Sequence, residues 1–246
     1  MHEKIICCLP TYNEAENIAA IVNAILRFVP QSSILIIDDH SPDGTGQIAD
    51  TLSHQDSRIS VLHRPQKEGL GKAYCHGFQV ALDRMKADII VQMDADLSHP
   101  PEKLPEMIDA IQMNDLVIGS RYIPGGGTKN WNMARRMISR FGAIYARVWL
   151  GLPVNDPTGG FKVWRSDLLK HVLACPVRSE GYGFQVETTF IARCLGARIV
   201  EIPICFSDRH VGRSKMTAGI AFEAFWQIPF MRVRCRYLKK KSGCYE

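Results

Sequence analysis

The amino-acid sequence predicts an α/β fold in which helices flank a mixed, mostly parallel sheet. Short apolar runs rich in β-branched residues alternate with longer segments whose apolar residues recur at helical spacing. Because parallel strands need a crossover between them, this alternation favours parallel pairing with helices on both faces of the sheet. At 246 residues, of which 46% are hydrophobic, the chain can bury one sizeable core.

The first half of the chain contains four predicted strands separated by three predicted helices. Apolar residues in the first helix, at 18–29, fall on one face, and Asn13 followed by Glu16 has the form of a capping box at its start. The expected strands cover 4–9, 33–37, 59–62 and 88–93, and the second and third helices cover 47–52 and 71–85.

The second half of the chain continues this pattern. Three glycines occur in the segment 124–128, and glycine loses more conformational freedom on ordering than other residues, so we expect a mobile loop over the ligand site there. The expected strands cover 116–119, 162–165 and 199–204, and the expected helices cover 131–150 and 185–194.

The C-terminal segment, 217–246, differs in character because aromatic residues are followed by arginines and lysines. Such a segment suits an amphipathic helix that lies on an anionic membrane surface. Alternatively, the helix packs its aromatic side chains on the core and turns its cations to water. We therefore expect a main domain at 1–216 and a separate C-terminal helix at 217–246.

Composition narrows the classes of partner and compartment. A net charge of +5 suits anionic partners, but no recognition motif or stacking platform accompanies it, so we do not expect nucleic-acid binding. The eight cysteines form no Cys-x-x-Cys pair and mostly lie in apolar runs, which predicts free thiols in a reducing, cytosolic compartment. No apolar run reaches about 18 residues, so no segment is expected to span a membrane.

Acidic residues follow two of the predicted strands. Asp38 and Asp39 come after the second strand, and Asp94 and Asp96 come after the fourth. Ligands of open α/β sheets bind outside the carboxyl ends of the strands. Two carboxylates one residue apart repel each other unless a cation lies between them, and oxygen ligands favour Mg²⁺ or Mn²⁺ over zinc. We interpret the nearby His99 as a hydrogen-bonding loop residue rather than a ligand.

Five motifs follow one another along the chain: PTYNE at 10–14, DDHSPDG at 38–44, DADLSHP at 94–100, GSRY at 119–122 and DRHVGRSK at 208–215. Together they closely resemble the dolichol-phosphate (polyprenol-phosphate) mannosyltransferases. These are inverting glycosyltransferases of family 2 with the GT-A (Rossmann-like) fold. The chain resembles the compact members without transmembrane helices, and the resemblance implies that 1–216 is the GT-A domain.

The resemblance implies transfer of mannose from GDP-mannose to the phosphate of dolichyl or polyprenyl phosphate, which yields a β-linked mannosyl phosphoryl lipid. Asp94, Asp96 and Arg121 then have catalytic roles, and Mg²⁺ or Mn²⁺ is held by the two aspartates and Ser98. The implied acceptor-phosphate residues are Arg121, Arg135 and Ser139, and the implied donor-binding residues are Pro10, Tyr12, Glu14, Ile37, Asp39, Asp94, Ala95, Asp96, Arg209 and Lys215.

Two positions depart from the family's pattern. His40 stands where a glycine usually follows the Asp-Asp pair, so its side chain has to occupy a turn that glycine normally eases. Ser98 stands where other members offer a glutamine to the metal, and its hydroxyl is a shorter and weaker ligand.

The chemistry of the acceptor agrees with the residue types. A phosphate monoester is largely dianionic at neutral pH, because its second pKa is about 6, so it needs no general base. It needs cations that bring two anions together, and Arg121 and Arg135 can bind phosphate with two N–H groups each. An ion pair with a neighbouring element is the competing interpretation of both arginines.

The sequence is also compatible with other substrates and with a non-catalytic role. UDP-glucose or another nucleotide sugar can replace GDP-mannose, because the sequence does not display the shape of the pocket. An alternative of another class is a non-catalytic subunit that binds nucleotide sugars. Peripheral attachment to the cytoplasmic face of a membrane is expected, at the endoplasmic reticulum in a eukaryote or the plasma membrane in a prokaryote. Small membrane subunits tether some compact relatives, and the sequence leaves their involvement open, as it does polyprenol length and oligomeric state.

Overall fold

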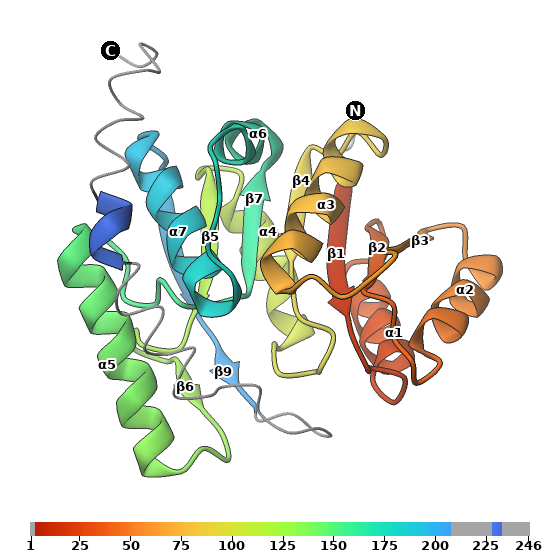
Figure 1. The fold of residues 1–246 in the computed structure, drawn as a ribbon, viewed down its shortest axis with the longest axis horizontal. Helices are drawn as coiled ribbons and strands as arrows, with labels where there is room; N and C mark the ends of the chain where they lie inside the picture. The colour runs from red at the N-terminus through yellow and green to blue at the C-terminus, as the bar shows by residue number, and fades with distance from the viewer. Residues whose placement is uncertain (1–2, 208–227, 233–246) are drawn as a thin grey trace.

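A seven-stranded sheet lies at the centre of the structure, a computed structural model that describes residues 3–207 and 228–232. Its strands have the order β3-β2-β1-β4-β7-β5-β8 (Figure 1). β7 pairs antiparallel with β4 and β5, whereas the other neighbours pair parallel, which confirms the mixed, mostly parallel sheet. The strands are β1 (Ile5–Thr11), β2 (Ser33–Asp38), β3 (Ile59–His63), β4 (Ile89–Gln92), β5 (Leu116–Ser120), β7 (Lys162–Arg165) and β8 (Ile199–Pro203).

Helices cover both faces of this sheet, as predicted. Successive residues of β1 alternate between two cores: Ile6 and Cys8 pack with α3, α6 and α7, whereas Cys7 and Leu9 pack with α1 and α4. The helices are α1 (Ile18–Phe28), α2 (Thr45–Gln55), α3 (Leu70–Asp83), α4 (Leu104–Ala110), α5 (Met133–Leu150), α6 (Ser166–Ala174) and α7 (Gly181–Cys194), and a 3₁₀ turn, η1 (Pro101–Lys103), precedes α4.

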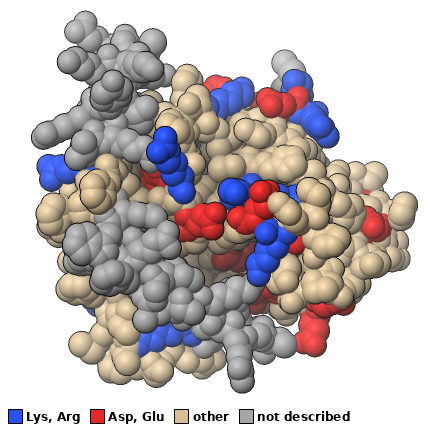
Figure 2. Space-filling model, viewed as in Figure 1, with Lys and Arg blue, Asp and Glu red and all other residues tan. Residues whose placement is uncertain are grey.

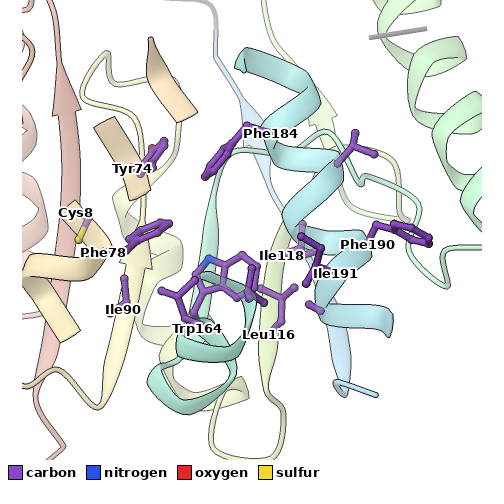
Figure 3. Close-up of a cluster of buried hydrophobic side chains, with 14 of the residues drawn as sticks. Cys8, Tyr74, Phe78, Ile90, Leu116, Ile118, Trp164, Phe184, Phe190 and Ile191 are labelled. Atoms are coloured by element: carbon purple, nitrogen blue, oxygen red, sulfur yellow. The ribbon is translucent and has the colours of Figure 1, made fainter. Parts of the chain in front are cut away.

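Aromatic side chains fill the first of these cores (Figure 3). Tyr74 and Phe78 of α3, Trp164 of β7 and Phe184 of α7 are all fully buried there. The Tyr74 ring stacks on Phe78 and Phe184, at centroid distances of 5.4 and 5.9 Å. This packing fixes α3 and α7 against the sheet beneath the edge where the acidic motifs lie.

The glycine-rich segment is a loop only at 124–126, because its last two residues form a strand that was not expected. β6 (Gly127–Thr128) pairs parallel with β9 (Cys205–Phe206) in a second, two-stranded sheet. Gly126 has no room for a side chain, because a Cβ atom would lie 2.6 Å from the Ser120 carbonyl oxygen. At this position glycine serves a close approach of two backbones rather than mobility.

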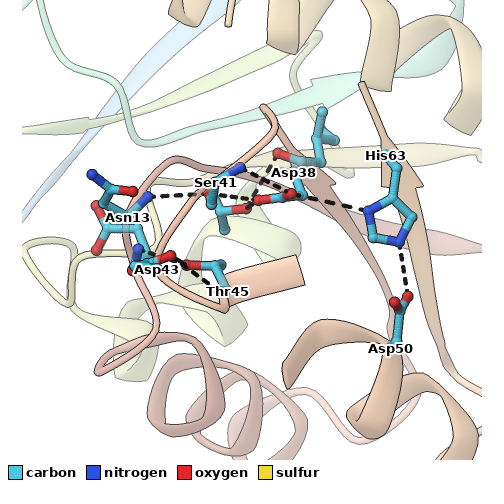
Figure 4. A network of polar contacts seen from close by, with 10 residues as sticks. Asn13, Asp38, Ser41, Asp43, Thr45, Asp50 and His63 are labelled. Carbon is cyan, nitrogen blue, oxygen red and sulfur yellow. Dashed lines mark hydrogen bonds and ion pairs between the residues drawn. The ribbon is translucent and has the colours of Figure 1, made fainter. Parts of the chain in front are cut away.

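The start of α1 also differs from the prediction. The capping box at Asn13 and Glu16 is wrong: α1 begins at Ile18, and Asn13 has a φ of 59°. The Asn13 amide donates to Ser41 Oγ at 3.1 Å, and the Glu14 amide donates to Thr45 Oγ1 at 2.9 Å (Figure 4). Tertiary hydrogen bonds to the loop after β2 therefore override the local capping pattern.

His40 lies in the same loop, with a φ of 59°. Glycine adopts this left-handed conformation with less strain than other residues, so the structure confirms that His40 occupies a turn that favours glycine. Neither α4 nor α6 is predicted from the sequence, because both are short. The other elements differ from their expected bounds by a few residues.

Little of the C-terminal segment is described. The predicted boundary at 216/217 and most of the tail lie outside the described residues, as do Arg209 and Lys215. Ile228 and Met231 are buried in the first core, and Arg232 Nη1 donates to the Trp149 carbonyl of α5 at 3.2 Å. In the described ranges, no helix combines the length and the apolar character that crossing a membrane requires.

Most of the described cysteines are free thiols, as predicted. Cys194 is the exception, since it is disulfide-bonded. Burial raises the pKa of the Cys7 thiol to about 12, so this thiol is not a reactive nucleophile at neutral pH. The free cysteines are Cys7, Cys8, Cys75, Cys175 and Cys205.

Gly126→Ala tests the close approach at β6. We expect it to lower the free energy of unfolding by about 1–3 kcal/mol, because the new methyl group collides with backbone atoms that cannot move aside easily. Gly127→Ala is the matched control, since no atom lies within 4 Å of its added Cβ. Urea unfolding of both variants measures the difference, and equal stabilities would contradict the steric argument.

Candidate active site

A cavity of about 260 Å³ opens at the carboxyl ends of β1, β2 and β4. Acidic and basic side chains surround a hollow near the middle of the face of the molecule that Figure 2 shows. Nine of the predicted site residues line the cavity, although they come from segments far apart in the sequence. They are Pro10, Tyr12, Glu14, Asp39, Asp94, Ala95, Asp96, Arg121 and Arg135.

Three other predicted residues do not line the cavity. Ile37 is fully buried in the core, where it fits closely against Gly77 of α3. The Ser98 side chain is buried, and its Oγ has no hydrogen-bond partner among the described residues. Ser139 Oγ accepts a hydrogen bond of 2.6 Å from the Tyr122 hydroxyl.

The two aspartates after β2 have different surroundings. Asp38 Oδ1 accepts a 2.6 Å hydrogen bond from Ser41 Oγ, and Asp38 Oδ2 lies 3.9 Å from His63 Nδ1 (Figure 4). His63 in turn contacts Asp50 at 2.8 Å. Asp38 therefore holds the loop in place, whereas Asp39 lines the cavity.

Cations at this end of the cavity were not predicted. Arg64 Nη1 pairs with Asp39 Oδ1, and both side chains are buried; its Nη2 lies 2.6 Å from Glu68. The Lys67 ammonium lies 3.6 Å from the centroid of the Tyr12 ring. The ion pair with Arg64 orients the Asp39 carboxylate, which can accept hydrogen bonds from a ligand's hydroxyl groups.

The loop after β4 orients the acidic pair. Asp94 Oδ1 accepts a 2.9 Å hydrogen bond from the Tyr74 hydroxyl, and the Asp94 amide donates to His99 Nδ1 at 3.1 Å. Asp96 Oδ1 accepts from the Ser98 amide at 3.1 Å. Leu97, between Asp96 and Ser98, has a φ of 60°. These contacts turn both carboxylates toward one cavity, and Tyr74 was not foreseen because it comes from α3.

His99 is a hydrogen-bonding loop residue, as predicted. It is buried, its ring stacks on Phe161 at 5.2 Å, and burial lowers the pKa of its imidazole. Among the described residues, no group of three or more His, Cys, Asp and Glu side chains has metal-binding geometry. Two carboxylates suffice for Mg²⁺ or Mn²⁺ when water and substrate oxygens supply the other ligands, so the residues present fit such an ion.

A buried ion pair holds Arg121 at the end of β5. Its Nε and Nη2 each donate to Asp156 at 2.7 Å, and Nη2 also donates to Thr158 Oγ1 at 2.8 Å. Burial alone would raise the pKa of Asp156, but the Arg121 charge and hydrogen bonds hold that pKa below its usual value. Arg121 Nη1 makes no hydrogen bond within the described residues, so this nitrogen can still bind an anion.

Arg135 stands on the first turn of α5. Asn132 caps this helix, since its Oδ1 accepts from the Arg135 amide at 2.8 Å. The Arg135 guanidinium lies 4.1 Å from the centroid of the Trp131 ring, which orients it toward the cavity beside Arg121. The cavity therefore has an acidic pair and two arginines on its walls.

Comparison with known proteins shows the family of this chain. Residues 6–173 match the model of the family described as glycosyl transferase family 2. The chain belongs to glycosyltransferase family 2. It is 47% identical over 221 residues to an undecaprenyl-phosphate mannosyltransferase of Micrococcus luteus, a match that covers 90% of each chain. It is 41% identical over 236 residues to a polyprenol monophosphomannose synthase of Mycolicibacterium smegmatis, covering 95% of this chain and 89% of that protein.

Solved structures confirm the GT-A fold of this glycosyltransferase. Glucosyl-3-phosphoglycerate synthase of Mycobacterium tuberculosis, solved with Mn²⁺ and UDP-glucose, superimposes with a TM-score of 0.66 at 19% identity, over 95% of this chain and 79% of that one. The same enzyme with phosphoglyceric acid gives a TM-score of 0.65 at 18% identity. At this identity the likeness concerns the fold.

Asp156→Asn tests the buried ion pair. We expect it to lower the free energy of unfolding by about 3 kcal/mol or more, because the Arg121 charge remains buried without a compensating anion. Asp167→Asn is the control, since the side chain is 91% exposed and its pair with Lys170 lies on the surface. Urea denaturation measures both, and an unchanged Asp156→Asn stability would contradict the role given to this pair.

Proposed function

We propose that this glycosyltransferase transfers mannose from GDP-mannose to the phosphate of polyprenyl or dolichyl phosphate, with inversion to a β-linked mannosyl phosphoryl lipid. The observation that carries the proposal is the meeting of Asp94 and Asp96 with Arg121 and Arg135 in one cavity. The two relatives named above are mannosyltransferases of polyprenol phosphates, by their names, and cover nearly the whole chain.

The donor would occupy the part of the cavity between β1 and the acidic pair. Pro10, Tyr12, Glu14 and Asp39 would contact the nucleoside, and Asp39 offers an oriented carboxylate to ribose hydroxyl groups. Ile37 would not contact the nucleoside, because it is buried in the core behind the residues that line the cavity. Arg209 and Lys215, which lie outside the described residues, are proposed to bind the donor phosphates.

Asp94 and Asp96 would hold Mg²⁺ or Mn²⁺ together with the donor diphosphate. The buried Ser98 hydroxyl, which lacks a described partner, is the proposed third protein contact of this site. When bound, the ion supplies positive charge that stabilises the departing nucleoside diphosphate. Tyr74 keeps Asp94 in place for this role.

The acceptor phosphate would bind on the opposite side, at Arg121 and Arg135. Arg121 has Nη1 for a phosphate oxygen, while Asp156 fixes the rest of its guanidinium. Ser139 would contribute to acceptor binding through Tyr122, because its Oγ accepts a hydrogen bond from the Tyr122 hydroxyl. Because the phosphate is largely dianionic at neutral pH, its oxygen attacks the anomeric carbon in line without a general base.

A lipid acceptor requires contact with a membrane, and the exposed side of α5 fits that partner. Seven of the twelve large hydrophobic side chains that are exposed in the described residues lie on this helix. Arginines on the same helix suit anionic headgroups. We therefore propose that the chain binds peripherally to the cytoplasmic face of a membrane through α5, with the tail at 217–246 as a second contact. The apolar residues are Met133, Met137, Ile138, Phe141, Ile144, Val148 and Trp149.

UDP-glucose is the alternative to GDP-mannose as the donor. UDP-glucose is bound by glucosyl-3-phosphoglycerate synthase, which shares the fold, so it is the competing nucleotide sugar. A non-catalytic binding subunit is disfavoured because the acidic pair and both arginines converge on the cavity.

Transfer of radiolabelled mannose from GDP-mannose to a short polyprenyl phosphate tests the proposal directly. We expect transfer by the purified chain with Mg²⁺ or Mn²⁺, its loss with a chelator, and a decrease of about 100-fold or more in Asp96→Asn, because charge on the leaving group is no longer stabilised. Asp109→Asn, at an exposed position of α4, is the control. Faster transfer from UDP-glucose, or full activity of Asp96→Asn, would refute the donor or the metal-dependent mechanism.

Aspartate at Met137 and Phe141 tests the membrane contact. We expect the double substitution to decrease binding to anionic liposomes at least tenfold, because two apolar side chains no longer enter the interface. Transfer to a short, water-soluble acceptor should be retained. Met113→Asp, at a residue that is 74% exposed outside α5, is the control for cosedimentation. Unchanged liposome binding would exclude α5 as the contact.

A further inference from the structure

We propose that Gln185 binds the sugar of the donor, donating hydrogen bonds from its side-chain amide to hydroxyl groups of the hexose. This inference rests on the proposed function, since it concerns the same cavity. Gln185 stands near the start of α7, is 3% exposed and lines the cavity. No motif in the sequence draws attention to it.

A chain of three buried side chains sets the orientation of the Gln185 amide. The Trp164 indole N–H can only donate, and it donates to Gln92 Oε1 at 3.1 Å. Gln92 must then present its amino group to Gln185, and its Nε2 donates to Gln185 Oε1 at 2.6 Å. Gln185 Oε1 therefore already accepts a hydrogen bond from Gln92, and the amino group of Gln185 is the part of the amide that can bind a ligand.

The amino group of Gln185 points to the region beside Asp94. A Cβ atom built on Gly160 would lie 3.4 Å from Gln185 Nε2 and 3.6 Å from Asp94 Oδ2, so both atoms border the same space. Within the described residues, Gln185 Nε2 has no hydrogen-bond acceptor, although Gln185 is almost fully buried. The two N–H donors of this group are thus directed at an open part of the cavity.

The position between donor and acceptor groups identifies the ligand as the sugar. Thr158, two residues before Gly160, accepts a hydrogen bond from Arg121, the proposed acceptor-binding residue. Asp94 belongs to the proposed diphosphate site. In a transfer reaction the sugar lies between the leaving diphosphate and the attacking phosphate, and Gln185 Nε2 borders that space. A neutral amide suits hydroxyl oxygens, whereas the diphosphate is bound by cations.

The backbone of Gln185 is fixed as firmly as its side chain. Its carbonyl oxygen accepts from Lys162 Nζ at 2.8 Å and from Thr189 Oγ1 at 2.9 Å. Burial lowers the pKa of Lys162 to about 7, and the side chain is fully enclosed beneath α7. Gln92 and Trp164 are positioning residues, because they act on a ligand only through Gln185.

Binding of GDP-mannose and of GDP, each measured calorimetrically with Mn²⁺ present, tests the assignment. In Gln185→Met, which has a similar length and no donor, we expect the affinity for GDP-mannose to decrease about threefold to tenfold, the effect of one or two lost hydrogen bonds. The affinity for GDP should change less than twofold. Gln185→Leu, which is also neutral and lacks the donor, should show the same selective loss if the methionine variant folds poorly.

Gln47→Met, on the exposed side of α2, is the matched control and should bind both ligands as the unchanged chain does. Equal losses for GDP and GDP-mannose, or no loss for either, would overturn the sugar contact. If the unchanged chain distinguishes UDP-glucose from UDP instead, the same variants are compared on that pair, and the donor assignment alone is corrected. An unchanged chain that binds no sugar nucleotide would overturn the proposed function, whereas binding of GDP-mannose without a selective loss in either variant would overturn the inference alone.

Discussion

Repulsion between negative charges is the constraint on which the arrangement of the cavity depends. Asp94 and Asp96 stand close to each other, and both proposed substrates carry phosphate groups. Each anion in such a site needs a cation placed in advance, because a mobile counterion would be lost with every exchange of ligand. Arg121 would meet this need on the proposed acceptor side, and its ion pair with Asp156 fixes the guanidinium at the end of β5.

The sheet explains why one face gathers these groups. β1, β2 and β4 run parallel, so the segments that follow them emerge at the same edge, and polar residues there meet although their sequence positions are far apart. The neighbouring residues Asp38 and Asp39 have different roles because their side chains have different surroundings. Asp38 contacts Ser41 and His63 and so holds the loop after β2, whereas Asp39 lines the cavity.

The strand and helix order and the acidic edge could be predicted because both are local patterns in the chain. The partners that orient the acids and Arg121 could not, since Tyr74, Arg64 and Asp156 reach the site from other elements and carry no motif of their own. The same reason explains the wrong capping box, because the hydrogen bonds of Asn13 go to a distant loop. Prediction therefore succeeded where chemistry follows sequence spacing and failed where it depends on long-range contacts.

α5 connects the proposed lipid surface to the site in physical terms. Water-exposed apolar side chains are unfavourable, and a contiguous row of them on one helix is uncommon on a protein that functions free in water. Arg135 lies on the first turn of this helix and lines the cavity, so a bilayer that covers the exposed face would bring acceptor headgroups to the same arginine. The Trp131 ring, whose centroid lies 4.1 Å from the Arg135 guanidinium, holds that side chain beside the cavity. The long apolar tail of the acceptor could then remain in the lipid while only its phosphate enters the cavity.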